Sequence, residues 1–374
     1  MSIEERIHEA LATVHDPEIH RPITDLGMVK SVEFTDGVAK IAVFLTVGAC
    51  PMQDTITQRV TNAVLAVEGV ASVEVELDVM SEQQRAALKE LLTGPAPTIP
   101  FQEADNTTRI FAVTSGKGGV GKSSVTVNLA VAFAQQGLRV GIIDIDVYGH
   151  SIPNMLGIDT EVTRLDDGLL MPPSKHGVKA LSILPFKPGG ASEPVAYRGP
   201  MLGKVLEQFL TDFYWQDCDV MLLDLPPGTG DVAMSLGQLL PNSELLIVTT
   251  PQPAAAEVSV RAGMMAKHTR QVVAGVVENM SGVVCPHCGE SMNLFGEGGG
   301  ERVAGHLSIE LHRTIKVLSK IPFEPQLREG MDEGEPIVVS HPDSAAAQAF
   351  TQLAKDLMGQ RRSLLGTSLK LSPR

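Results

Sequence analysis

The hydrophobic positions divide the chain into a short first part and a long second part. In residues 1–92, apolar residues recur at helical spacing in three stretches, and two strand-like stretches flank a turn at Asp36 and Gly37. The first part is therefore predicted to fold as a small α/β unit. The expected helices lie near residues 3–14, 56–67 and 81–92, and the expected strands at 29–34, 38–45 and 70–77.

A proline-rich stretch, residues 93–107, separates the two parts and has the composition of a semi-rigid linker. Strand and helix patterns then alternate through residues 108–360, and residues 361–374 remain as a tail. Several strand candidates are uninterrupted apolar runs, which fit parallel strands buried on both faces. They span 110–114, 140–144, 180–184, 220–225, 245–249, 272–277 and 317–321. This pattern predicts a doubly wound, mostly parallel sheet that binds ligands at the carboxyl ends of its strands.

Composition narrows the class of protein. A hydrophobic content of 43% in 374 residues is enough for a sizeable core, and the net charge of −14 argues against constitutive nucleic-acid binding. No apolar run approaches the roughly 18 residues of a membrane-spanning helix, and the N-terminus lacks the features of a signal peptide. Four cysteines are too few for a disulfide framework. We therefore expect a cytoplasmic protein that binds neither membrane nor nucleic acid.

The strongest motif follows the first strand of the second part. Its glycines fit both the dinucleotide pattern G-x-G-x-x-G and the P-loop pattern G-x4-G-K-[ST]. Lys122 and Ser123 favour the P-loop, because a triphosphate with Mg²⁺ needs a cation and a hydroxyl on the first helical turn. We expect Lys122 to neutralise the β- and γ-phosphates of ATP and Ser123 to ligate Mg²⁺. The residues expected to contact the nucleotide are Gly116, Lys117, Gly118, Gly119, Val120, Gly121, Lys122, Ser123 and Ser124.

Two later strand ends carry carboxylates suited to nucleotide hydrolysis. We assign Asp146 to the attacking water, and expect Asp144 to support Mg²⁺ or the loop. An acid at this distance from the glycines can also bind ribose in a dinucleotide fold, which stays the alternative. Asp224 ends an apolar run typical of a Walker B strand and is expected in the water shell of Mg²⁺. Residues 226–228 then form a loop able to sense the γ-phosphate.

Lys117 is a second lysine inside the glycine-rich loop, and holding one nucleotide does not require it. Such a lysine marks the deviant P-loop ATPases, a group that includes MinD, ParA, ArsA and the nitrogenase iron protein. The resemblance implies that Lys117 reaches the nucleotide of a partner subunit and takes part in catalysis. A solvated loop lysine is the alternative interpretation.

Cys285 and Cys288 form a C-x-x-C pair followed by Gly289, which is half of a metal-binding knuckle. A zinc ion or an iron–sulfur cluster takes four ligands, and the chain has no second such pair. The missing ligands can come from a symmetry-related chain. A redox pair and an inert pair remain as alternatives. Cys50 precedes a predicted helix and is either a reactive or metal-binding thiol or a small buried residue, whereas Cys218 fits the core.

Taken together, these stretches closely resemble the Mrp/ApbC family of iron–sulfur cluster carriers over about residues 108–360. Residues 1–92 resemble the small SufT-like domain that is often fused ahead of that ATPase. The motifs that carry the resemblance lie at 115–123, 144–149, 197–201, 224–231, 278–281, 285–288 and 295–300, and in the first part at 16–18, 25–29 and 49–51.

The resemblance implies a homodimer that binds a [4Fe–4S] cluster through Cys285 and Cys288 of each chain. It also implies ATP binding, slow hydrolysis, and delivery of clusters from a scaffold protein to recipient apoproteins. Asn279 matches a position that tends to contact adenine. Two other functions stay open: a spatial-organisation ATPase switch of the MinD or ParA kind, and a zinc-bridged dimeric ATPase, because thiolates alone do not separate zinc from iron–sulfur.

Overall fold

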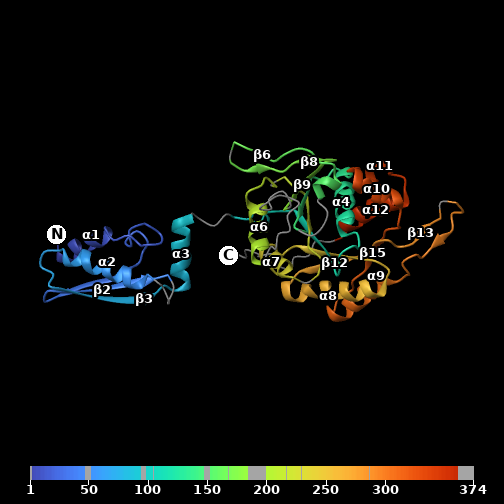
Figure 1. The fold of residues 1–374 in the computed structure, drawn as a ribbon. Coiled ribbons are helices and arrows are strands. Elements are labelled where there is room, and N and C mark those ends of the chain that lie inside the picture. Colours follow the sequence, from blue (N-terminus) through green and yellow to red (C-terminus); the bar gives the residue numbers. More distant parts are fainter. Residues whose placement is uncertain are drawn as a thin grey trace, which may run out of the picture. The chain divides into compact units, whose positions relative to one another are not determined.

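The computed structural model describes residues 2–46, 52–93, 98–103, 105–146, 152–166, 168–183, 199–215, 217–228, 230–285 and 287–360. The chain forms two compact units, Met1–Pro97 and Thr98–Arg374, each described by itself (Figure 1). Several residues named above lie outside the described residues: Cys50 with its neighbours 48, 49 and 51, most of the linker prolines, 147–150, 197–198, Thr229, Pro286 and the tail 361–374.

The described part of the first unit is a three-stranded sheet covered by helices. β1 (Val29–Thr35) and β2 (Val38–Leu45) pair antiparallel around the predicted turn, and β3 (Ser72–Val79) pairs parallel to β2. The crossover that a parallel pair requires is α2 (Gln53–Leu65). Its apolar face packs with α1 (Ile3–Ala12) into one core. α3 (Glu82–Thr93) follows β3.

Among the described residues, the second unit is built on an eight-stranded sheet. Every neighbouring pair is parallel except the edge pair β8–β9. The strands, in sheet order, are β15 (Val317–Lys320), β12 (Val272–Glu278), β11 (Glu244–Thr249), β4 (Arg109–Ser115), β10 (Val220–Asp224), β5 (Val140–Asp144), β9 (Val178–Ser182) and β8 (Ser174–Lys175). The predicted doubly wound, mostly parallel sheet is confirmed, and the strand that leads to the P-loop lies in its interior.

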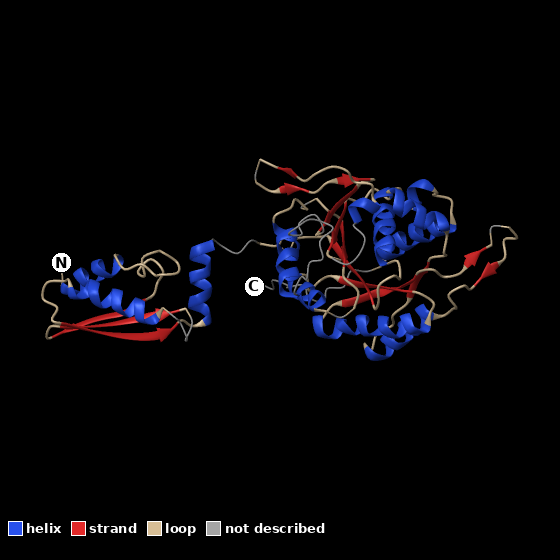
Figure 2. Cartoon of the chain, in the orientation of Figure 1, coloured by secondary structure: helices blue, strands red, loops and turns tan. Residues whose placement is uncertain are grey.

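Helices cover both faces of this sheet (Figures 1 and 2). One face carries α4 (Lys122–Gln135), α5 (Ile152–Met155), α10 (Pro325–Glu333), α11 (Ile337–Ser340) and α12 (Ala345–Gly359). The other carries α6 (Gly199–Thr211), α7 (Asp231–Leu239), α8 (Pro253–Thr269) and α9 (Gly299–Glu310). No helix in the described residues is long and apolar enough to cross a membrane.

Successive residues of β4 alternate between the two hydrophobic cores, as the two-residue period of a strand requires. Phe111 and Val113 belong to one core, and Ile110 and Ala112 to the other. Ile99 and Phe101, which the predicted linker included, are buried in the second core, and Phe101 lies in the short helix η1 (Pro100–Gln102). The end of the linker therefore packs onto the second unit.

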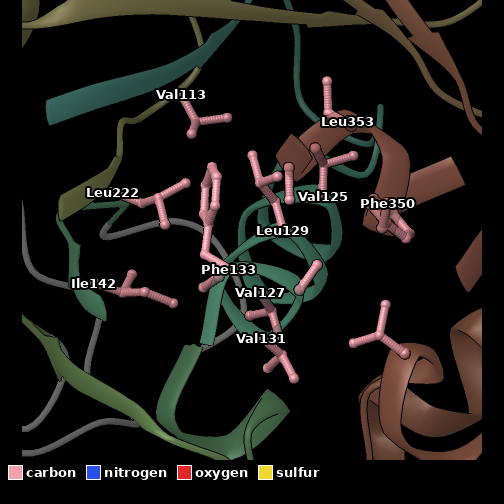
Figure 3. Close-up of a cluster of buried hydrophobic side chains, with 14 of the residues drawn as sticks. Val113, Val125, Val127, Leu129, Val131, Phe133, Ile142, Leu222, Phe350 and Leu353 are labelled. Carbon is pink, nitrogen blue, oxygen red and sulfur yellow. The ribbon is translucent and has the colours of Figure 1, made fainter. Parts of the chain in front are cut away.

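The helix that follows the P-loop is buried on all sides. Residues 125–133 of α4 are all buried, as expected for a helix enclosed between a sheet and further helices. Figure 3 shows Val113, Ile142 and Leu222 of three neighbouring strands on one side of α4, with Phe350 and Leu353 of α12 on another. This packing holds α4 between the sheet and α12 and so sets the position of its first turn, which begins at Lys122.

Candidate nucleotide site and cysteine hairpin

The glycine-rich loop turns directly into α4, whose first residue is Lys122. Gly119 and Gly121 have φ values of 79°, in the left-handed region that favours glycine. A Cβ atom at Gly121 would lie 2.2 Å from Nδ2 of Asn279. The turn thus needs a glycine for its conformation and for the close approach of Asn279. The free backbone N–H groups at such a helix start form an anion site.

A cavity of about 260 Å³ lies against this loop. Its lining consists of Ser115, Lys117, Gly118, Gly119, Val120, Gly121, Lys122, Ser123, Ser124, Asp146, Met155 and Pro227. Most of the residues predicted to contact the nucleotide thus come together with Asp146. Gly116, Asp224 and Asn279 are not part of the lining. Sequence reasoning missed Met155, which reaches the cavity from the separate helix α5 and carries no motif.

Lys122 joins the two candidate catalytic strand ends. Its Nζ atom lies 2.6 Å from Oδ2 of Asp224 and 3.2 Å from Oδ2 of Asp146. Burial lowers the pKa of Lys122, but the carboxylates of Asp224 and Asp146 outweigh it and raise the pKa above its ordinary value. The ammonium group is therefore charged at neutral pH and lies between the two acids.

Asp224 also accepts hydrogen bonds from two hydroxyls of α4. Ser123 Oγ donates to Oδ2 at 2.6 Å, and Thr126 Oγ1 donates to Oδ1 at 2.7 Å. The Ser123 hydroxyl and the Asp224 carboxylate are thus adjacent hard oxygen groups, the kind of donor that Mg²⁺ prefers. Thr126 carried no sequence signal, because its contact joins segments about a hundred residues apart.

Asp144 at the end of β5 bonds to groups from three places in the second unit. Its carboxylate accepts hydrogen bonds from Asp146 N at 3.0 Å, from Ile152 N at 3.2 Å and from Ser182 Oγ at 2.9 Å. Burial, followed by the nearby charge of Asp224, raises the pKa of Asp144 to about 7. Both roles expected for Asp144, support of Mg²⁺ and support of the loop, stay predictions.

Lys117 and Asn279 make contacts within this chain. Lys117 Nζ donates to Oε1 of Gln252, the residue that caps α8, at 3.3 Å. Asn279 Nδ2 donates to the carbonyl of Val120 at 2.9 Å, while Asn279 Oδ1 is buried without a hydrogen-bond partner among the described residues. Asn279 therefore holds the P-loop at Val120 through this hydrogen bond. Its contact with adenine and the reach of Lys117 across a dimer stay predictions.

The C-x-x-C pair lies on a hairpin that projects from the second unit (Figure 1). β13 (Val283–Val284) and β14 (Ser291–Met292) pair antiparallel, and Cys285 N donates to the carbonyl of Glu290 at 2.9 Å. Backbone N–H groups of Cys288 and then His287 donate to the Cys285 sulfur, and with the Cys288 side chain they lower the pKa of Cys285. Half-buried Cys285 and exposed Cys288 are thus presented at one turn.

The other thiols do not join this pair. Cys218 is buried, and burial raises its pKa to about 12, so it stays protonated. Cys50 lies outside the described residues. In the part of the chain that the structure describes, no group of three or more His, Cys, Asp or Glu side chains is placed to hold a metal ion. The described hairpin therefore offers two thiols and no complete four-ligand site.

Comparisons with known proteins agree with both units. The family model described as NUBPL iron-transfer P-loop NTPase matches residues 106–358, and the model described as iron-sulfur cluster assembly protein matches residues 4–77. The iron-sulfur cluster carrier protein of Mycobacterium tuberculosis is 52% identical over 98% of this chain and 96% of its own length. That of Deinococcus radiodurans is 41% identical over 94% and 93%.

A solved structure extends the likeness to the fold. The nucleotide-binding protein of Archaeoglobus fulgidus in complex with ADP is 35% identical, and the match covers 65% of this chain and 91% of that one with a TM-score of 0.52. The likeness to this protein therefore holds for both the sequence and the fold. The chain therefore belongs to the family of iron-transfer P-loop NTPases whose curated members are named iron–sulfur cluster carrier proteins.

Proposed function

We propose that this protein is an ATP-dependent carrier that binds a [4Fe–4S] cluster across a homodimer and transfers it to recipient apoproteins. One observation carries the proposal: the same unit holds a P-loop cavity beside the acid–lysine network of Lys122, Asp146 and Asp224, and a half-buried and an exposed thiol at one turn, the first with a lowered pKa. A nucleotide switch accounts for the cavity alone, and a structural zinc site accounts for the thiols alone. Carriage of a cluster under nucleotide control uses both.

In the nucleotide site, Lys122 and the N–H groups of the loop bind the phosphates of ATP. Ser123 and Asp224 hold Mg²⁺, which neutralises phosphate charge when bound, and their adjacent oxygens fit that ion. Asp146 lies at the cavity wall beside Lys122 and orients the attacking water. Lys117 acts on the nucleotide of the second copy, and Asn279 contacts the base.

The cluster is the cargo, and Cys285 and Cys288 of two copies hold it. Two thiolates per chain supply half of the four ligands that a four-iron cluster takes, so a two-fold axis completes the site. Exposed apolar side chains lie on the hairpin and just after it: Val284, Met292 and Leu294 are 56%, 50% and 66% exposed. Such a patch suits an interface with the second copy, a scaffold or a recipient. Reduced thiols of this kind fit the cytoplasm.

The test is anaerobic purification followed by a visible spectrum and analysis of iron, sulfide and zinc in the full chain. We expect a cluster spectrum, about two iron atoms per chain and a dimer by light scattering. Cys285→Ser and Cys288→Ser should each abolish the iron while nucleotide affinity is unchanged. Cys218→Ser is the matched control, because that thiol is buried away from the hairpin.

Two outcomes contradict the proposal. Zinc without sulfide, at about half an ion per chain, supports the zinc-bridged dimer instead. If iron remains bound in Cys285→Ser, the cluster lies elsewhere, and Cys50 of the first unit becomes a candidate ligand. In either case calorimetry with ATP still reports on the P-loop, so the nucleotide and cluster halves of the proposal are tested separately.

A further inference from the structure

We infer that the segment Glu278–Gly282 couples the P-loop to the cysteine hairpin, with Glu278 and Ser281 as positioning residues. The inference rests on the proposed function, because it assigns the route by which nucleotide binding alters the cysteine pair. The segment leaves the end of β12, contacts the P-loop, and enters the hairpin within five residues. The P-loop pattern includes neither Glu278 nor Ser281, which lie far from it in the sequence.

The first step of the route is the contact between Asn279 and the P-loop. Besides its side-chain bond to the Val120 carbonyl, Asn279 donates its backbone N–H to the carbonyl of Thr249 at 2.8 Å. A Cβ atom on Gly121 would strike the Asn279 amide, so loop and side chain are in close contact. Any displacement of the loop around Val120 and Gly121 therefore displaces Asn279.

The second step is the buried carboxylate of Glu278, which is 1% exposed. Its Oε1 accepts a hydrogen bond from Ser281 Oγ and its Oε2 one from Gly300 N, both at 2.6 Å. A Cβ at Gly300 would lie 3.1 Å from Cβ of Glu278, so glycine permits this approach. Glu278 thus ties the base of the hairpin to the first turn of α9, where the helix dipole favours an anion.

The third step is the clamp at the base of the hairpin. Ser281 N donates to the Ile321 carbonyl at 2.8 Å, and Phe323 N donates to the Gly282 carbonyl at 2.9 Å. The ring of Phe295, beyond the hairpin, packs edge-on against Phe323 with centroids 6.0 Å apart. Both strands of the hairpin therefore leave from one fixed base, and Cys285 follows Gly282 by three residues.

The segment also carries two unfavourable features. Met280 has a φ of 58°, which non-glycine residues rarely adopt, and Asn279 Oδ1 is buried without a hydrogen-bond partner among the described residues. Such features persist only where the surroundings fix them, and they cluster at elements that switch. A nucleotide that moves the loop can therefore change which arrangement of this segment is favoured.

The experiment measures how fast each thiol of the full, metal-free chain reacts with iodoacetamide, with peptide mass spectrometry as the readout. Rates at Cys285 and Cys288 are compared without nucleotide, with Mg-ADP and with a slowly hydrolysed Mg-ATP analogue. In the parent chain, nucleotide should change these rates. Ser281→Ala should remove that dependence while calorimetry finds the same nucleotide affinity. Ser281→Thr keeps the hydroxyl and should restore the dependence.

Ser291→Ala is the matched control: this exposed serine lies on the same hairpin, near Gly282, but it is not one of the groups that donate a hydrogen bond to Glu278. It should keep the nucleotide dependence. Glu278→Gln is a second disruptive variant, since it removes the charge that the α9 terminus and Ser281 share. Circular dichroism checks that each variant is folded.

The outcomes separate the two proposals. A parent chain that does not bind nucleotide refutes the proposed function. A parent chain that binds nucleotide without any change at the cysteines refutes the coupling alone. If Ser281→Ala and Glu278→Gln both keep the full dependence, dimer formation rather than this segment shields the thiols, and the inference is wrong.

Discussion

The nucleotide site and the cysteine hairpin lie in one unit and are built in opposite ways. The side chains of Lys122 and Asp224 are 5% and 0% exposed, and both bond to further groups of the same chain. The hairpin consists of two-residue strands, and Val284 on it is 56% exposed. A two-stranded ribbon is marginal by itself, so its firm contacts lie at its base.

The contrast indicates which groups each site takes from its own chain and which it would take from others. Buried charges are tolerated only when they are paired, so the network of Lys122, Asp146 and Asp224 forms within one chain. The hairpin presents Cys288 to solvent, which suits the proposed cargo site, because other proteins would have to reach it. We therefore expect changes in the first region to act on binding and rate, and changes in the second to act on metal content.

The largest expected effect is on hydrolysis. Asp146→Ala should bind ATP and slow its hydrolysis by on the order of 10²–10⁴-fold, because it removes the group that we propose to orient the attacking water. Single-turnover assays measure this rate. Asp159→Ala, an exposed acid nearby in sequence, is the control and should hydrolyse at the parent rate. An unchanged rate in Asp146→Ala would move the role to Asp144 or Asp231.

Lys122→Ala should weaken ATP binding by at least about 30-fold, because it removes the cation that we expect to pair with the phosphates. Losing one partner of a buried, hydrogen-bonded charge pair costs about 2–5 kcal/mol of binding free energy. The change also leaves Asp224 and Asp146 facing each other without a cation. Calorimetry measures the affinity. Lys267→Ala removes an exposed pair with Glu310 and should leave the affinity unchanged. Near-parent affinity in Lys122→Ala would remove the P-loop assignment.

Lys117→Ala tests whether the nucleotide site is complete within one chain. The variant should still bind nucleotide, because the contact of Lys117 with Gln252 is peripheral to the acid–lysine network. It should hydrolyse nucleotide poorly, because we propose that Lys117 acts on the nucleotide of the second copy. Mixing it with Lys122→Ala should restore part of the activity in heterodimers. If no mixing ratio restores activity although the two variants associate, Lys117 acts within its own chain.

The sequence predicted the parts of this molecule that depend on local pattern. Strands buried on both faces appear as apolar runs, so the central strands around β4 were found to within a few residues. The short pairs β6 (Thr163–Arg164) with β7 (Leu170–Met171), and β13 with β14, were missed because two residues show no period.

The same distinction holds within the candidate site. The loop from Gly116 to Ser123 follows a fixed spacing and was named in full. Thr126 on Asp224, Asn279 on Val120 and Glu278 on Gly300 join segments that only the folded chain brings together. Their residue types fit many environments, and no spacing distinguishes them. Contacts between distant segments are therefore the part of a site that a single sequence conceals.

The smallest effect concerns the hairpin thiols and follows from a pKa shift. Hydrogen bonds from the N–H groups of Cys288 and His287 lower the pKa of Cys285, so its thiolate forms at a lower pH than that of an ordinary cysteine. Its alkylation rate should reach half-maximum below about pH 8.5, the ordinary cysteine value. Cys218, with its pKa near 12, should react only after unfolding.

Gly289→Ala gives this prediction a structural control. Gly289 has a φ of 74° and donates its N–H to the Cys285 carbonyl, closing the turn that presents the N–H groups to the sulfur. An alanine there strains the turn although its Cβ meets no atom within 4 Å. The pH midpoint for alkylation of Cys285 should rise toward the ordinary value. As the pH is lowered, iron should be lost at a higher pH than in the parent chain, since the thiolate is the ligand. A Cys285 midpoint at the ordinary value in the parent chain would mean that the hairpin does not activate its thiol, and the contrast with Cys218 would then reflect exposure alone.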